Sequence, residues 1–217
     1  ELPTLFTQPD QARFMERSVN EPLFESEKPK EIQLIMIPDL SGSMDPDKRR
    51  AVQKSSYLLI RSLMKYQLDQ KIRADDSDAG QFDISLRVIG FGDSHQDLFD
   101  RTESEKATGI TSSEDFDALE VRLAQSILAI GTTDLGGTND DTALEEAYQS
   151  VNDPIMKDRL ERDDAVSVIM EVTDGETQTE SSSGIIVGRL NQIKNVFARA
   201  IKIPGSLYAD RPVAPDP

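Results

Sequence analysis

Short apolar runs along the chain predict the strands of a buried sheet. The runs Glu31–Ile37 (EIQLIMI) and Ala165–Val172 (AVSVIMEV) are nearly continuous, as is typical of strands covered on both faces. Two further runs, Phe82–Phe91 and Val196–Ile203, predict two more strands. Residues 96–101 predict a short edge strand that pairs with the strand over Phe82–Phe91.

Between these runs, apolar residues recur at the three- and four-residue spacing of amphipathic helices. Asp45-Pro46 offers an N-cap and a first helical residue, and Ser112 and Asp115 have the spacing of a capping box. The predicted helices are Asp47–Ile72, Glu114–Ile130, Asp140–Val151 and Ile185–Lys194. Strands that alternate with helices predict an α/β fold whose parallel sheet is covered on both faces.

The length of 217 residues suits one domain plus an extension. We interpret residues 31–203 as the domain and residues 204–217 as an irregular tail. Residues 1–30 are polar and proline-containing without clear periodicity, so we interpret them as an N-terminal arm or linker. Phe6, Phe14 and Phe24 are candidate anchors of this arm on the domain.

The composition excludes several classes of function. Lys and Arg total 24 against 40 Asp and Glu, which gives a net charge of −16. We expect no nucleic-acid binding, because phosphates require basic clusters and the one basic cluster is Lys48-Arg49-Arg50. The absence of cysteine excludes disulfides and thiolate chemistry, and the single histidine, His95, argues against zinc sites and Ser-His-Asp catalysis.

The same features bear on location. No apolar run approaches the roughly 18 residues of a membrane span, and no secretory signal is visible. The absence of cysteine favours a reducing compartment, so we expect a cytoplasmic protein. The sequence opens on Glu1 rather than methionine, and we interpret it as a piece of a longer protein.

Three loops concentrate short oxygen-bearing side chains. Asp39, Ser41 and Ser43 follow the first predicted strand, Thr138 lies in a glycine-rich loop (GTTDLGGT), and Asp174 follows the strand that ends at Val172. Because the carboxyl ends of parallel strands lie at one edge of a sheet, these side chains are able to converge there. Carboxylates and hydroxyls without soft ligands suit a hard cation, which we expect to be Mg²⁺, with Mn²⁺ or Ca²⁺ as alternatives.

Such a site predicts binding rather than bond cleavage. Two carboxylates and three neutral hydroxyls leave a dication only just neutralised. An open coordination position then favours an acidic oxygen from outside, so we expect a protein partner that offers an Asp or Glu carboxylate.

The ordered set Asp39-x-Ser41-x-Ser43, Thr138 and Asp174 resembles the metal-ion-dependent adhesion site (MIDAS) of von Willebrand factor type A domains. The resemblance covers residues 31–203. It implies a Rossmann-like, doubly wound, mostly parallel sheet with helices on both faces and a short antiparallel edge strand. It also implies hydroxyl ligation by the two serines and the threonine, with the two aspartates acting directly or through water.

The short, glycine-spaced loops look closer to the intracellular bacterial members of this family. Some of those members work beside AAA+ ATPases, including the chelatase subunits, so an adaptor for an AAA+ ATPase or metal chelatase is an alternative function.

The chain departs from the family pattern in two places. Pro38 precedes the first motif aspartate. The family usually adds a helix and a strand after the strand that ends here at Ile203. Three explanations are open: the chain is truncated, the fold is shortened, or residues 1–30 fill the vacant edge.

A metal-dependent phosphatase is the remaining alternative. Phosphoryl-transfer hydrolases of the haloacid dehalogenase type require a second aspartate two residues after the first, and Ser41 stands there. The chain has no P-loop and no evident general base. We therefore expect that the protein is not an enzyme.

Overall fold

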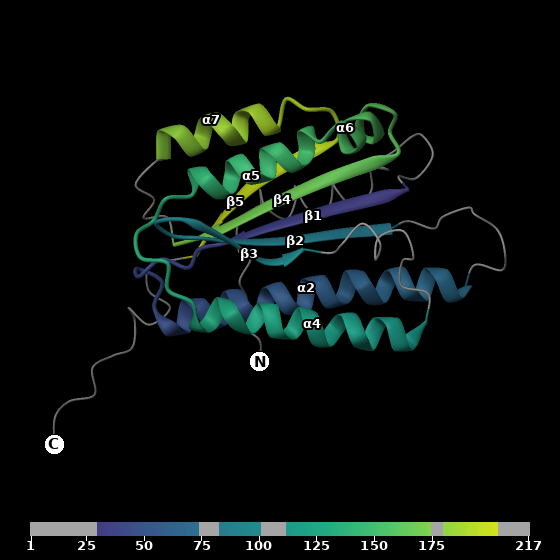
Figure 1. The fold of residues 1–217 in the computed structure, drawn as a ribbon, viewed down its shortest axis with the longest axis horizontal. Coiled ribbons are helices and arrows are strands. Elements are labelled where there is room, and N and C mark those ends of the chain that lie inside the picture. Colours follow the sequence, from purple (N-terminus) through teal and green to yellow (C-terminus); the bar gives the residue numbers. More distant parts are fainter. Residues whose placement is uncertain (1–29, 74–82, 101–111, 175–179, 204–217) are drawn as a thin grey trace, which may run out of the picture.

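A five-stranded sheet forms the centre of the molecule (Figure 1). The computed structural model describes residues 30–73, 83–100, 112–174 and 180–203. The strand order is β3-β2-β1-β4-β5, and only the β2–β3 pair is antiparallel. The strands are β1 (Glu31–Pro38), β2 (Asp83–Phe91), β3 (His95–Asp100), β4 (Ala165–Thr173) and β5 (Val196–Lys202). The predicted α/β class, with a mostly parallel sheet and an antiparallel edge strand, is confirmed.

Helices cover both faces of the sheet (Figure 1). On one face lie α2 (Pro46–Arg73) and α4 (Ser113–Thr132); on the other lie α5 (Asp141–Asn152), α6 (Pro154–Glu161) and α7 (Glu180–Leu190). Alternate residues of β1 point to the two sides. Leu34 and Met36 join the core under α2 and α4, whereas Ile35 and Ile37 join the core under α5, α6 and α7. Burial on both faces explains why β1 is almost continuously apolar.

Local capping chemistry sets where several helices begin. The Asp45 carboxylate accepts hydrogen bonds of 2.9 Å from the backbone N–H groups of Asp47 and Lys48 at the start of α2. Ser112 and Asp115 form the expected capping box at the start of α4.

Two helix predictions need correction. The sequence analysis predicted no helix over residues 154–161, where α6 lies. Asp153-Pro154 repeats the Asp45-Pro46 signal for a helix start. The Asp153 carboxylate accepts hydrogen bonds from the backbone N–H groups of Ile155 and Met156. The helix predicted over Ile185–Lys194 is α7, which begins and ends earlier at Glu180–Leu190. Its serine-rich first turn lacks apolar periodicity, which moved the predicted start toward the C-terminus.

An apolar groove lies on the α2 side of β4 and β5. It has a volume of about 210 Å³, and its lining includes Met36, Val52, Leu59, Met170 and Ile201. Phe197 and Ile201 of β5 are exposed. A helix after β5, as in the family pattern, would cover this region. The N-terminal arm proposed for the vacant edge falls almost wholly within residues 1–29, which lie outside the described part of the chain, as do residues 204–217.

Among the helices that the structure describes, none combines the length and the apolar character needed to cross a bilayer.

Candidate metal site

Asp39 lies at the end of β1, where the parallel strands end. It is fully buried, and its backbone N–H donates to the Val172 carbonyl at 2.8 Å. Its Oδ1 accepts from the Ser41 backbone N–H and its Oδ2 accepts from the Thr173 hydroxyl, both at 2.8 Å. Pro38 keeps its register with Val172 in the β1–β4 pair, so the proline does not interrupt the strand. The carboxylate is therefore held in one orientation before any ligand arrives.

The two motif serines place their hydroxyls side by side. Ser41 Oγ and Ser43 Oγ are 2.8 Å apart, with Ser41 fully buried and Ser43 half-buried. One loop thus places two neutral oxygens together, and the same loop binds the Asp39 carboxylate through the Ser41 backbone N–H.

The glycine-rich loop is tied to this serine loop by backbone hydrogen bonds. The Gly42 N–H donates to the Gly136 carbonyl at 2.7 Å, and the Leu135 N–H donates to the Leu40 carbonyl at 3.0 Å. Gly136 has a φ of +83°, and a Cβ there would lie 2.4 Å from Asp93 Oδ2. The positive φ and the close Asp93 carboxylate therefore favour glycine at this crossing.

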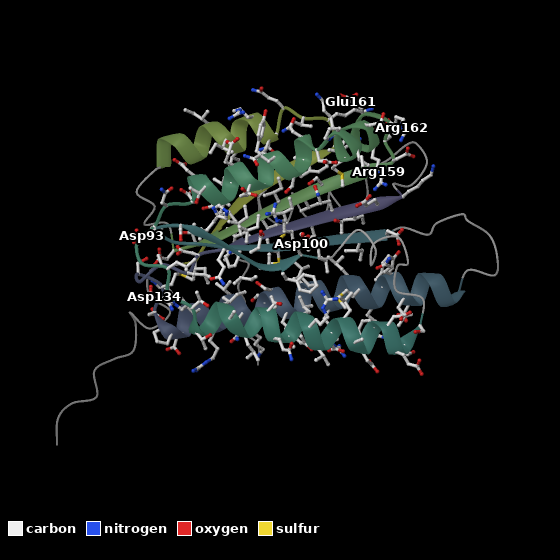
Figure 2. All side chains as sticks on the ribbon, in the orientation of Figure 1. Asp93, Asp100, Asp134, Arg159, Glu161 and Arg162 are labelled. Atoms are coloured by element: carbon white, nitrogen blue, oxygen red, sulfur yellow. The ribbon has the colours of Figure 1, made fainter. Side chains whose placement is uncertain are left out.

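Thr138 follows in the same loop and is buried. The next residue, Asn139, donates its backbone N–H to the Gly92 carbonyl at 2.8 Å, which ties this part of the loop to the end of β2. Figure 2 shows Asp93 and Asp134, from the β2 end and the glycine-rich loop, at the same end of the molecule.

Asp174 follows β4 and faces a buried lysine. Lys48 Nζ, from the first turn of α2, lies 3.1 Å from Asp174 Oδ2, and the two side chains are 8% and 1% exposed. The neighbouring Thr173 hydroxyl donates to Asp39, so both motif aspartates belong to one connected set of contacts.

Arg49 joins the serine loop to the glycine-rich loop. Its guanidinium donates three hydrogen bonds of 2.8 Å, to the carbonyls of Met44, Thr133 and Ser41. A planar group with several donors suits this role, because it satisfies diverging carbonyls at once. Arg49 is therefore a positioning residue for both loops.

Two more buried carboxyl groups lie next to the motif. Burial, in the first place, and the nearby carboxylates of Asp140 and Asp39 together raise the pKa of Glu171 to about 8. Glu171 is therefore mostly protonated at neutral pH. Asp140 is also buried, just before the first turn of α5.

Sequence reasoning missed Lys48, Arg49, Asp140 and Glu171 as parts of this site. The sequence held a signal for Lys48 and Arg49. Three consecutive basic residues near the start of a helix oppose the helix dipole, so they require nearby acceptors. Glu171 also had a signal, as a charged residue inside an apolar strand.

The structure thus places the three predicted loops at one edge of the sheet. Asp39, Ser41 and Ser43 share one loop, Thr138 lies in the loop tied to it, and Asp174 is adjacent to Thr173. Over the described residues, no group of three or more histidine, aspartate or glutamate side chains is arranged to hold a metal ion. The predicted set relies instead on two carboxylates and three hydroxyls, a chemistry that fits a hard cation.

Comparison with known proteins adds information on the fold. No protein-family model matches the chain, and no curated protein matches it either. The manganese-loaded TRAP protein of Plasmodium vivax is similar over 86% of this chain and 66% of its own, with a TM-score of 0.50 and 16% identity. BatB from Bacteroides thetaiotaomicron is similar over 79% of this chain and 66% of its own, with a TM-score of 0.49 and 16% identity.

A third similar structure is that of proximal thread matrix protein 1 from the mussel byssus, with a zinc-occupied MIDAS motif. It aligns over 81% of this chain and 36% of its own, with a TM-score of 0.46 and 17% identity. The chain spans slightly less than two thirds of TRAP and of BatB. At these identities the likeness concerns the fold alone. The described residues thus have a Rossmann-type α/β fold like that of von Willebrand factor type A domains.

Proposed function

We propose that this chain is a metal-dependent protein-binding module. A divalent cation, Mg²⁺ in the first place, would be held by Asp39, Ser41, Ser43, Thr138 and Asp174. The observation that carries the proposal is the connection of the three loops. The Gly42–Gly136 and Leu135–Leu40 hydrogen bonds join two of them, and the Thr173–Asp39 hydrogen bond joins the third.

The residues of the site favour recognition of an acidic partner. When bound, the cation supplies an open coordination position for an Asp or Glu carboxylate of the partner. Ser41 and Ser43 contribute neutral oxygens, so they leave positive charge at the site for that carboxylate. Asp39 is already oriented by the Ser41 N–H and the Thr173 hydroxyl, which lowers the ordering cost of binding. The similar TRAP structure is manganese-loaded, which supports a divalent cation as the ligand of this site.

Binding is favoured over hydrolysis because the carboxylates near the site already have partners. Asp39 accepts two hydrogen bonds, and Asp174 pairs with the Lys48 ammonium. Glu171 is mostly protonated at neutral pH, so it is a poor base there. A general base for a metal-bound water is not evident among these groups.

Thermal unfolding of the full chain tests the cation site. The chain is treated with EDTA and then titrated with Mg²⁺, Mn²⁺ or Ca²⁺. A cation at 100 times its Kd stabilises the folded state by about 2.7 kcal/mol, which raises the Tm by about 5–10 °C in a domain of this size. Asp39→Ala and Ser43→Ala remove predicted ligands and should lose this rise.

The matched control is Asp93→Ala, which removes an exposed acid at the same end of the molecule (Figure 2). It should keep the rise if the effect belongs to the motif and not to general negative charge. An equal rise in wild type and in both ligand variants would refute the site.

Partner binding is tested separately. We expect Asp39→Ala to abolish metal-dependent capture of a partner while the chain stays folded. Capture that persists in excess EDTA would contradict a metal-mediated interface. Co-purification of an AAA+ ATPase with the wild-type chain would assign the module to the adaptor class.

A further inference from the structure

A lysine ammonium occupies the place beside Asp174 where the proposed function requires a cation. Lys48 Nζ lies 3.1 Å from Asp174 Oδ2, and only 8% of the lysine side chain is exposed. Lys48 and Asp174 are 126 residues apart in the chain, so helix α2 and strand β4 must both be in place for this pair to form.

The position of Lys48 is unfavourable by itself. It lies in the first turn of α2, where the helix dipole repels positive charge. Burying an ammonium is also costly unless a carboxylate faces it. Asp174, itself buried, provides that carboxylate. Each charge of the pair therefore offsets the free-energy cost of burying the other.

The two following basic residues do not share this role. Arg49 donates to the carbonyls of the two site loops, and Arg50 is 76% exposed, with its nearest carboxylate, that of Asp47, 3.7 Å away. Within this basic triplet only Lys48 faces a motif carboxylate. Arg50 therefore offers a matched control of equal charge on the same turn of helix.

A second carboxylate, that of Asp45, lies near the lysine ammonium. Asp45 Oδ2 lies 4.0 Å from Lys48 Nζ, and the Asp45 side chain is 53% exposed at the start of α2. Because Asp45 is exposed, the ammonium can turn toward it and toward water without a new burial cost. A divalent cation that binds Asp174 can therefore displace the lysine ammonium toward Asp45.

We propose that Lys48 is a resident cation of this site, which neutralises Asp174 in the metal-free chain and competes with the divalent cation for that carboxylate. The inference rests on the proposed function, since it assigns Asp174 to the metal site. Two consequences follow. Lys48 stabilises the metal-free fold, and it weakens metal binding until a further carboxylate, such as that of a partner, adds negative charge.

Isothermal titration calorimetry with Mg²⁺ and with Mn²⁺ alone tests the proposal on the full chain. The variants are Lys48→Met, which keeps the length of the side chain and removes its charge, and Arg50→Met as the control. We expect Lys48→Met to bind at least tenfold more tightly than wild type, and Arg50→Met to stay within about threefold of wild type. In EDTA, Lys48→Met should melt below wild type, and saturating Mg²⁺ should remove the difference.

Two further variants cover a failure of Lys48→Met to fold. Lys48→Gln keeps an N–H donor for Asp174 without a charge and should also bind the cation more tightly. Lys48→Arg keeps the charge and should bind as weakly as wild type.

The outcomes separate this inference from the proposed function. Equal cation affinity in wild type and in the neutral Lys48 variants would overturn the inference and leave the metal site intact. Tight binding by the neutral variants alone would support it and would show that the lysine suppresses metal binding in the wild type. An absence of binding in wild type and in every variant would overturn both the inference and the metal site.

Discussion

The buried Glu171 side chain makes the stability of this protein depend on pH. Its pKa is about 8 in the folded chain, against an ordinary value of 4.5 that applies to the unfolded chain. Between these two values the folded state holds a proton that the unfolded state has released. The free energy of unfolding therefore falls as the pH rises through this window, because deprotonation favours the unfolded chain.

The magnitude follows from the separation of the two pKa values. Each pH unit within the window costs about 1.4 kcal/mol, so the full loss from pH 4.5 to pH 8 is on the order of 5 kcal/mol. This is a large part of the 5–15 kcal/mol that typically stabilises a folded domain. Above pH 8 both states are deprotonated at this group, and its contribution no longer changes.

Glu171→Gln removes the titration and keeps the shape of the side chain. Its amide can donate to the Asp140 carboxylate at every pH, as the protonated glutamate does only below its pKa. Relative to wild type, we expect the variant to be similar in stability at pH 5 and more stable by up to about 5 kcal/mol at pH 9.

The assay is urea denaturation in EDTA at pH 5, 6, 7, 8 and 9, analysed as the difference between variant and wild type so that other titrating groups cancel. The matched control is Glu161→Gln, an exposed glutamate at the end of α6 (Figure 2), which should follow wild type at each pH. A Glu171→Gln profile parallel to that of wild type would refute the assignment of a protonated, buried carboxyl group.

Three other changes test the loops and the open groove. Arg49→Ala removes three hydrogen bonds to loop carbonyls and should lower the free energy of unfolding by about 2–4 kcal/mol in urea denaturation, while an unchanged midpoint would contradict its positioning role. Gly136→Ala places a Cβ at a positive φ and against Asp93 Oδ2, so it should lower the free energy of unfolding by about 1–3 kcal/mol in the same assay. Gly188→Ala in α7, where a Cβ meets no atom within 4 Å, should leave stability unchanged or raise it. Deletion of residues 1–28 should lower the Tm by several degrees, because we expect this arm to cover the apolar groove beside β5; an unchanged Tm would reject that occupant.

Much of the fold was predictable because it depends on local patterns. The strands begin and end within one residue of the predicted positions, since each is an apolar run bounded by polar residues. The start of α2 followed from Asp45-Pro46 and that of α4 from Ser112 and Asp115. Helix α6 was missed because only eight residues, with two buried apolar side chains, carry its pattern.

The candidate site was predictable as far as strand ends determine it. Asp39 and Asp174 follow neighbouring parallel strands, so their loops had to meet at one edge of the sheet. The partners of these residues were not predictable in the same way. Arg49 reaches the Thr133 carbonyl across 84 residues of sequence, and no local pattern encodes that distance.

Local sequence was enough to predict the positions of the strands, the starts of two helices and the three loops that carry the five oxygen-bearing side chains, because neighbouring residues decide each of these. Tertiary packing was needed to reveal that Lys48 faces Asp174, that Glu171 lies against Asp140, and that an apolar groove lies on the α2 side of β5. These features depend on how helices pack on the sheet. Burial then sets the charge state of Glu171 and keeps the Lys48–Asp174 pair out of water, and burial is a property of the assembled layers.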